Sequence, residues 1–158
     1  MNLIYAAHVI TAILFLGPVM FATSTFQVQA LAAHKGDAQA VGSAALMYRV
    51  TTIYGALSGL VPVFGIAAWI FAYPHLMKNG LYHASILLCI IAWAVLYLAI
   101  IPRQRTMMAG LGALDPDQPG NKKVKKVSDW NKTKSQLSMF GGIFNGLWLL
   151  VALLMVIV

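Results

Sequence analysis

The sequence predicts an all-α integral membrane protein, a bundle of four transmembrane helices. Two observations lead to this prediction: four long apolar runs contain no Lys, Arg, Asp or Glu, and nearly all the basic residues lie between them. Each run reaches the roughly 20 residues that a helix needs to cross the hydrocarbon core. The runs are Leu3–Phe26, Val50–Tyr73, Leu81–Ile101 and Leu137–Val158. Because little chain remains outside them, residues 1–158 are predicted to form a single transmembrane domain.

The basic residues predict the orientation of the bundle. Lys and Arg in short loops keep those loops in the cytoplasm. The segments 27–49 and 102–136 hold all the Lys and Arg except Lys78, which lies in the 74–80 loop. We therefore expect 27–49 and 102–136 to be cytoplasmic, and both termini and the 74–80 loop to lie outside. The net charge of +7 follows from this arrangement, so nucleic acid is not an expected partner.

The first run is predicted to be a retained span with a bend. Its N-terminal end carries no Lys or Arg, and its apolar stretch is longer than the core of about 7–15 residues found in a signal peptide. Gly17-Pro18 is expected to bend the helix, because proline cannot donate to the preceding turn.

The second and fourth runs carry small-residue pairs that predict close helix packing. In each run two glycines stand four residues apart with a polar residue beside them, and this spacing lets a neighbouring helix approach closely. The residues are Gly55, Gly59 and Ser58 in the second run, and Gly142, Gly146 and Asn145 in the fourth. Since Ser58 and Asn145 fall at similar depth, we expect a hydrogen bond between them. The glycine faces could equally serve contacts between two copies of the chain.

The connection after the third run is long and basic. Pro102 is predicted to end or kink the third helix, and 106–114 is apolar enough to lie on the membrane or to extend that helix. A basic cluster follows, formed by Lys122, Lys123, Lys125 and Lys126. The cluster predicts contact with anionic lipid headgroups, and docking of an acidic partner is the alternative. Ser128 or Asp129 is predicted to cap the helix that leads through Trp130 into the fourth run.

Acidic residues are scarce, which disfavours several functions. The chain has no glutamate, and its four aspartates lie outside the apolar runs. Proton pumps and cation-coupled transporters usually keep an acidic residue within the membrane, and a channel needs a polar or charged ring. A small channel or transporter is therefore only a third alternative. No phosphate-binding loop, nucleophile elbow or zinc-protease motif is present, and the single Cys89 predicts neither a disulfide nor a thiolate cluster.

The histidines are the sharpest candidates for binding chemistry. With the predicted topology, His8, His75 and His83 gather at the outer face of the membrane, and Met77 lies nearby. Imidazole is the commonest metal ligand, and histidine with methionine suits copper. His8 and His83, at similar depth on two spans, could also ligate haem b. Packing and interfacial contact of these residues is the other interpretation.

Several short motifs resemble those of a superfamily of small helical membrane proteins. The superfamily includes CopD-like copper-resistance proteins, haem-containing membrane protoporphyrinogen oxidases and integral membrane proteins of unknown function, and the last group is the most similar. The matching motifs are Ala6-Ala7-His8-Val9-Ile10, Phe15-Leu16-Gly17, Gly36-Asp37, Tyr54-Gly55, Val61-Pro62 and Pro102-Arg103. The resemblance implies that His8 is a haem ligand, as in the oxidases, or a copper contact, as in the copper proteins, and that His83 is the second histidine.

These observations together favour a non-catalytic membrane protein that acts through helix packing and lipid contact. We expect it to be an accessory or assembly subunit of a larger complex, for which actinobacterial respiratory complexes offer an analogy, or to assemble with copies of itself. A bacterial plasma membrane is the expected location. The alternative, from a different class, is a haem- or copper-binding redox protein that uses the outer histidines.

Overall fold

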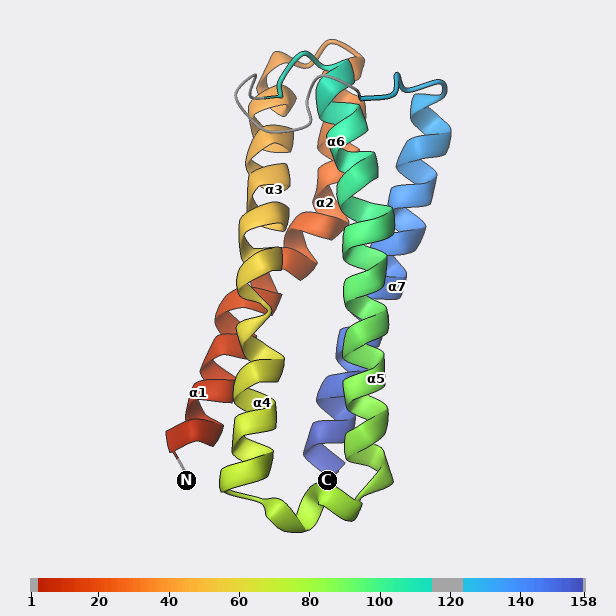
Figure 1. Ribbon diagram of the computed structural model, residues 1–158. Coiled ribbons are helices and arrows are strands. Elements are labelled where there is room, and N and C mark those ends of the chain that lie inside the picture. The colour runs from red at the N-terminus through yellow and green to blue at the C-terminus, as the bar shows by residue number, and fades with distance from the viewer. Residues whose placement is uncertain (1–2, 115–123, 158) are drawn as a thin grey trace.

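The computed structural model describes residues 3–114 and 124–157, and in this part of the chain all the regular secondary structure is helical. Four long helical segments run side by side (Figure 1). They comprise α1 (Leu3–Thr11), η1 (Ala12–Leu16) and α2 (Gly17–His34); α3 (Ala38–Leu57) and α4 (Leu60–Phe71); α5 (Gly80–Ala94), η3 (Val95–Ile100) and α6 (Ile101–Gly110); and α7 (Trp130–Ile157). The short helix η2 (Pro74–Lys78) joins α4 to α5. The predicted all-α four-helix bundle is confirmed.

Each of the four segments is long and apolar enough to cross a membrane, so the chain is a polytopic integral membrane protein. The start of α1, the end of α7 and η2 lie at one end of the bundle, which we call the terminal end (Figure 1). The turn between α2 and α3, the end of α6 and the start of α7 lie at the opposite end, which we call the basic end. This arrangement places both ends of the described chain on the same side, as the sequence predicts.

The helices extend beyond the predicted spans at the basic end. The shortest segment has 28 residues, which at about 1.5 Å per residue is about 42 Å long, against a hydrocarbon core of about 30 Å. The third helix extends into 106–114 and ends at Gly110, and the fourth begins directly after Asp129, as two of the sequence predictions allow. The helical parts of 27–49 were not predicted. Alanines account for much of the extra helix in α2 and α3, because alanine has the highest helix propensity. Hydrophobicity locates the apolar part of a span and misses its helical extension.

A tight turn joins α2 to α3. Gly36 has φ 106°, a left-handed conformation that glycine adopts without a steric penalty. The N–H of Gly36 bonds to Ala33 O and the N–H of Asp37 bonds to Ala32 O, both at 3.1 Å, which is the bonding pattern of a glycine-terminated helix. The Asp37 carboxylate then accepts the N–H of Gln39 at 3.0 Å and so caps α3. These local bonds fix the two helices as an antiparallel hairpin.

Prolines bend the long segments and do not end them. The first segment bends between α1 and α2 (Figure 1), where the π-helical η1 precedes Pro18. In the second segment the helix is interrupted at Ser58 and Gly59, four and three residues before Pro62, whose ring nitrogen carries no proton. The third segment continues through Pro102 into α6. The π-helical η3, whose turn holds more residues than an α-helical turn, lies just before this proline and accommodates it.

The most tightly packed core lies in the half of the bundle nearer the basic end. There α2 packs against α3 and α7, and α3 packs against α6. The largest fully buried apolar side chains are Phe26, Phe144, Leu96, Ile100, Met107, Met108 and Leu137. Toward the terminal end α1 packs on α4 and α5 packs on α7, and α1 buries no residue completely.

Trp130 joins three helices at the basic end. Its ring stacks on that of His34, with centroids 4.0 Å apart and planes 7° apart. A Cβ added to Gly110 would lie 2.8 Å from Trp130 Cζ2. The last turn of α2, the last turn of α6 and the first turn of α7 therefore meet around one aromatic side chain. His34 is exposed, as expected of a residue at this end.

Candidate functional site

Polar contacts between helices concentrate on α4 and the break that precedes it. The Ser58 hydroxyl accepts a hydrogen bond from Trp93 Nε1 at 3.2 Å and donates to Gly55 O at 2.6 Å. One turn further, Val61 O accepts from His8 Nδ1 at 2.9 Å, and Gly65 O accepts from the Tyr82 hydroxyl at 2.8 Å. The second span is thus bonded to α1 through His8 and to α5 through Tyr82 and Trp93. These bonds replace contacts with water that the membrane interior cannot supply.

Glycines provide the space for these side chains. A Cβ added to Gly65 would lie 3.0 Å from His8 Cε1, and one added to Gly59 would lie 3.2 Å from Trp93 Cη2. A Cβ at Gly55 would lie 3.1 Å from Leu96 Cδ2. Side chains of α5 and η3 therefore occupy the surface of Gly55 and Gly59, while α1 occupies that of Gly65. The absence of a Cβ at each glycine is what allows these close approaches.

The hydrogen bond expected between Ser58 and Asn145 does not form. Asn145 Nδ2 instead donates to Ser24 Oγ at 2.7 Å and to Met20 O at 3.3 Å, while Ser58 bonds to Trp93. The reason is the order of the helices: α7 packs against α2 and α5. Similar depth in two spans does not determine which helices are neighbours.

In the fourth span the close contact is made by Gly141. A Cβ added to Gly141 would lie 2.7 Å from Thr23 O, so α7 and α2 approach backbone to backbone there. A Cβ added to Gly142 or Gly146 would meet no atom of the described chain within 4 Å. These two glycines therefore do not pack against another helix of this bundle. The four-residue spacing identified a small-residue face of α7, but that face points away from α2.

Each outer histidine contacts a residue of the segment from α4 to the start of α5. His8 is half-buried against Gly65, and His83 is exposed beside Trp69, with ring centroids 5.7 Å apart. His83 Nδ1 bonds to Asn79 O at 3.0 Å. A carbonyl oxygen only accepts, so Nδ1 carries the proton in both histidines, and in the neutral rings the lone pair is on Nε2. His75 is exposed, and its ring lies 6.1 Å from that of Tyr73.

The fit of these residues to a metal site is partial. Among the described residues, no group of three or more His, Cys, Asp and Glu side chains is placed to hold a metal ion. The Met77 side chain lies outside the described part of the structure. The described donors therefore do not form a copper site with three protein ligands of these types, and ligation by His8 and His83 alone stays a prediction.

Two of the predicted lipid-contact residues and Arg103 lie at the basic end. Lys125 and Lys126 are exposed shortly before α7, whereas Lys122 and Lys123 lie outside the described residues. Asp129 is confirmed as the cap of α7, since its carboxylate accepts the N–H of Lys132 at 2.9 Å. Arg103 is half-buried on α6, where it contacts Gln136 of α7.

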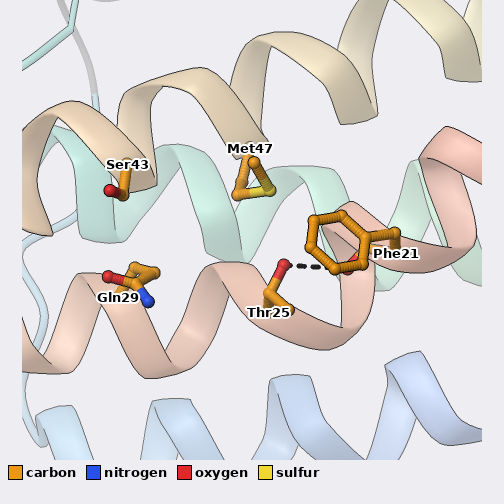
Figure 2. A pocket seen from close by; sticks show the side chains of 5 residues that line it. All are labelled: Phe21, Thr25, Gln29, Ser43 and Met47. Carbon is orange, nitrogen blue, oxygen red and sulfur yellow. Dashed lines mark hydrogen bonds between the residues drawn. The ribbon is translucent and has the colours of Figure 1, made fainter.

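Surface grooves offer little for small-molecule chemistry. Figure 2 shows one between α2 and α3, lined by Phe21, Thr25, Gln29, Ser43 and Met47. Its volume is about 180 Å³, below the roughly 300–1,000 Å³ typical of ligand sites. The Thr25 hydroxyl is already bonded to Phe21 O at 2.8 Å. A larger groove of about 330 Å³ is lined by residues of α3 alone, so it lies along one helix and is not enclosed by several elements.

Sequence reasoning missed four residues that make close contacts between helices: Gly65, Tyr82, Trp93 and Gly141. An aromatic residue with a polar tip on a span facing a proline-interrupted span is the signal that could have found Tyr82 and Trp93. Comparison of the chain with protein-family models, with curated protein sequences and with solved structures found no match. The geometry therefore carries the functional argument.

Proposed function

We propose that this chain is a non-catalytic accessory or assembly subunit of a larger membrane complex, with a respiratory complex as the first class to test. The observation that carries the proposal is the outward face of α7. Gly142 is exposed, and neither Gly142 nor Gly146 has an atom of the described chain within 4 Å of an added Cβ. Ser138, four residues before Gly142, is also exposed.

The physical argument concerns what such a face can contact. Association of helices in lipid depends on close van der Waals packing, which small residues allow by letting two backbones approach. The equivalent glycines inside the bundle, Gly59, Gly65 and Gly141, are each covered by a neighbouring helix. A helix of another subunit, or of a second copy, would cover Gly142 and Gly146 in the same way.

The polar side chains within the spans support a packing role as well. His8, Tyr82, Trp93 and Asn145 each bond to another helix of this chain. Their groups are therefore used to join helices. We further propose a bacterial plasma membrane as the location, with the basic end in the cytoplasm, because Lys and Arg near span ends favour that side.

The proposal predicts that the double substitution Gly142→Leu with Gly146→Leu removes the partner without unfolding the chain. Gly142 is exposed and Gly146 is half-buried, and an added Cβ meets no atom of another helix at either position, so the melting temperature of the isolated protein should change little. The complex should be smaller on native gels, and the proteins that co-purify with the wild type from the native membrane should no longer co-purify. Ala152→Leu, at another exposed position of α7, is the matched control. Retention of an unchanged complex in the double variant would contradict the proposal.

A haem- or copper-binding redox protein is the second candidate, and one observation favours it. His8 and His83 each donate Nδ1–H to a backbone carbonyl, which is how ligating histidines are usually oriented. Haem or copper, if bound, would supply one-electron chemistry, and His8 and His83 would hold it through Nε2.

The accessory-subunit proposal expects the purified protein to show no haem absorption in either redox state and no stoichiometric copper. It also expects His8→Ala to weaken the contact of α1 with α4, seen as a lower melting temperature, because the bond to Val61 O is lost. A haem band or bound copper that disappears in His8→Ala and persists in His34→Ala would replace the first proposal with the second.

A further inference from the structure

Arg103 is held rigidly at the basic end by contacts with two helices. Its Nε donates to Gln136 Oε1 of α7 at 3.4 Å, and its Nη1 donates to Ala99 O at 2.9 Å. The guanidinium carbon lies 4.7 Å from the centroid of the Phe140 ring. The side chain is half-buried. The guanidinium is thus oriented by an amide, a carbonyl and an aromatic face, all of which are uncharged.

The described part of the chain supplies no carboxylate to this cation. Its two aspartates, Asp37 and Asp129, accept bonds from backbone N–H groups at the starts of α3 and α7. The two bonds of Arg103 use two of the five N–H donors of a guanidinium. A partly desolvated charge is costly without a counter-charge. An anion other than these two described carboxylates would satisfy both the charge and the donors that the two bonds leave.

The surroundings of Arg103 indicate which anion. Arg103 follows the apolar run Leu81–Ile101 directly, and the end of such a run is where lipid headgroups are expected. On α7, Met139 is 53% exposed and Ile143 is 44% exposed, and both are within one helical turn of Phe140 in sequence. The acyl chain of a lipid whose phosphate is bound at Arg103 would therefore lie against these apolar side chains.

We propose that Arg103 binds the phosphate of an anionic phospholipid, and that Gln136 and Phe140 position its guanidinium. A guanidinium donates two parallel bonds to phosphate oxygens, a geometry that an ammonium group cannot reproduce. Lys132, four residues before Gln136 on α7 and exposed, adds positive charge at the same end. This site goes beyond the proposed function and does not depend on it, since a free-standing membrane protein would bind lipid in the same way.

The delipidated protein is mixed with phosphatidylglycerol or with phosphatidylcholine of the same acyl chains. Native mass spectrometry then measures how much of each lipid stays bound. We expect the wild-type protein to prefer phosphatidylglycerol, and Arg103→Gln to reduce that preference about fivefold or more. The matched control is Arg49→Gln, which removes an exposed arginine of α3 and should keep the preference. Equal retention of both lipids by the wild type, or an unchanged preference in Arg103→Gln, would overturn the proposal.

Two further measurements separate the alternatives. Gln136→Leu keeps the charge of Arg103 and removes one bond that positions it. It should therefore lower the preference for phosphatidylglycerol partially, even if Arg103→Gln fails to fold. No change in this variant would contradict the positioning role. Inorganic phosphate added alone should not raise the melting temperature. If it stabilises the wild type as strongly as phosphatidylglycerol does, the site binds a free anion and the lipid assignment is wrong.

Discussion

Gly141→Ala is expected to destabilise the bundle by about 1–3 kcal/mol, the usual cost of overpacking a closely packed site. The added Cβ would lie 2.7 Å from Thr23 O and 3.4 Å from the carbonyl carbon of the same residue. Backbone atoms cannot rotate away as a side chain can, so α7 must move off α2. This loss of stability is expected even though a helix intrinsically prefers alanine to glycine, an effect of about 1 kcal/mol in the opposite direction.

The neighbouring glycine provides the control. Gly142→Ala makes the same chemical change one residue later, where no described atom lies within 4 Å of the added Cβ. It should leave stability unchanged or raise it by up to about 1 kcal/mol. Reversible unfolding in mixed micelles measures both variants, and equal effects at the two positions would show that α2 and α7 do not meet at Gly141.

A second measurement identifies the contact that is lost. If α7 moves off α2, the hydrogen bonds from Asn145 to Ser24 and Met20 should weaken with it. Asn145→Leu should then cost less in the Gly141→Ala background than in the wild-type chain, as expected for residues that share one interface. Strictly additive effects of the two substitutions on the free energy of unfolding would show that the two contacts are independent.

The pair Gly141 and Gly142 also shows where sequence reasoning stops. A four-residue glycine spacing correctly indicates that α7 has a small-residue face, but it selects Gly142 and Gly146, which no helix of the described chain covers. The rotation of α7 about its axis is fixed by burial of Leu137, Phe144 and Trp148. That rotation depends on all the neighbouring helices together and cannot be obtained from one helix alone.

The spans themselves were predictable because the membrane imposes a strong constraint on composition. The number of helices, the shared side of the chain ends and the cap at Asp129 all follow from residues close together in the sequence. The helical extensions in α2 and α3 were missed, since alanine-rich segments such as the start of α3 are helical without being apolar enough for a span. Those in α6 and α7 were predicted from the apolar 106–114 segment and the cap at Asp129. The contacts of His8 with Val61 and of Tyr82 with Gly65 join residues distant in sequence, so no local pattern specifies them.

The second large effect is expected at Gln104, where substitution should stabilise the protein. Gln104 is completely buried, and neither its Nε2 nor its Oε1 has a hydrogen-bond partner among the described residues. It lies on the same stripe of the third segment as Ile100, Met107 and Met108, which are also fully buried. An unpaired amide in apolar surroundings costs about 1–3 kcal/mol. Gln104→Met, which keeps the length of the side chain, should recover an amount of this order in reversible unfolding.

Gln136→Met is the matched control, because the Gln136 amide is paired with Arg103. Removing one hydrogen bond to a charged group should lower stability by about 1–3 kcal/mol, the opposite sign to Gln104→Met. Destabilisation by Gln104→Met would contradict the prediction, and it would have a specific meaning. A polar group from outside the described residues would then pair with the amide, and the buried glutamine of α6 would serve binding.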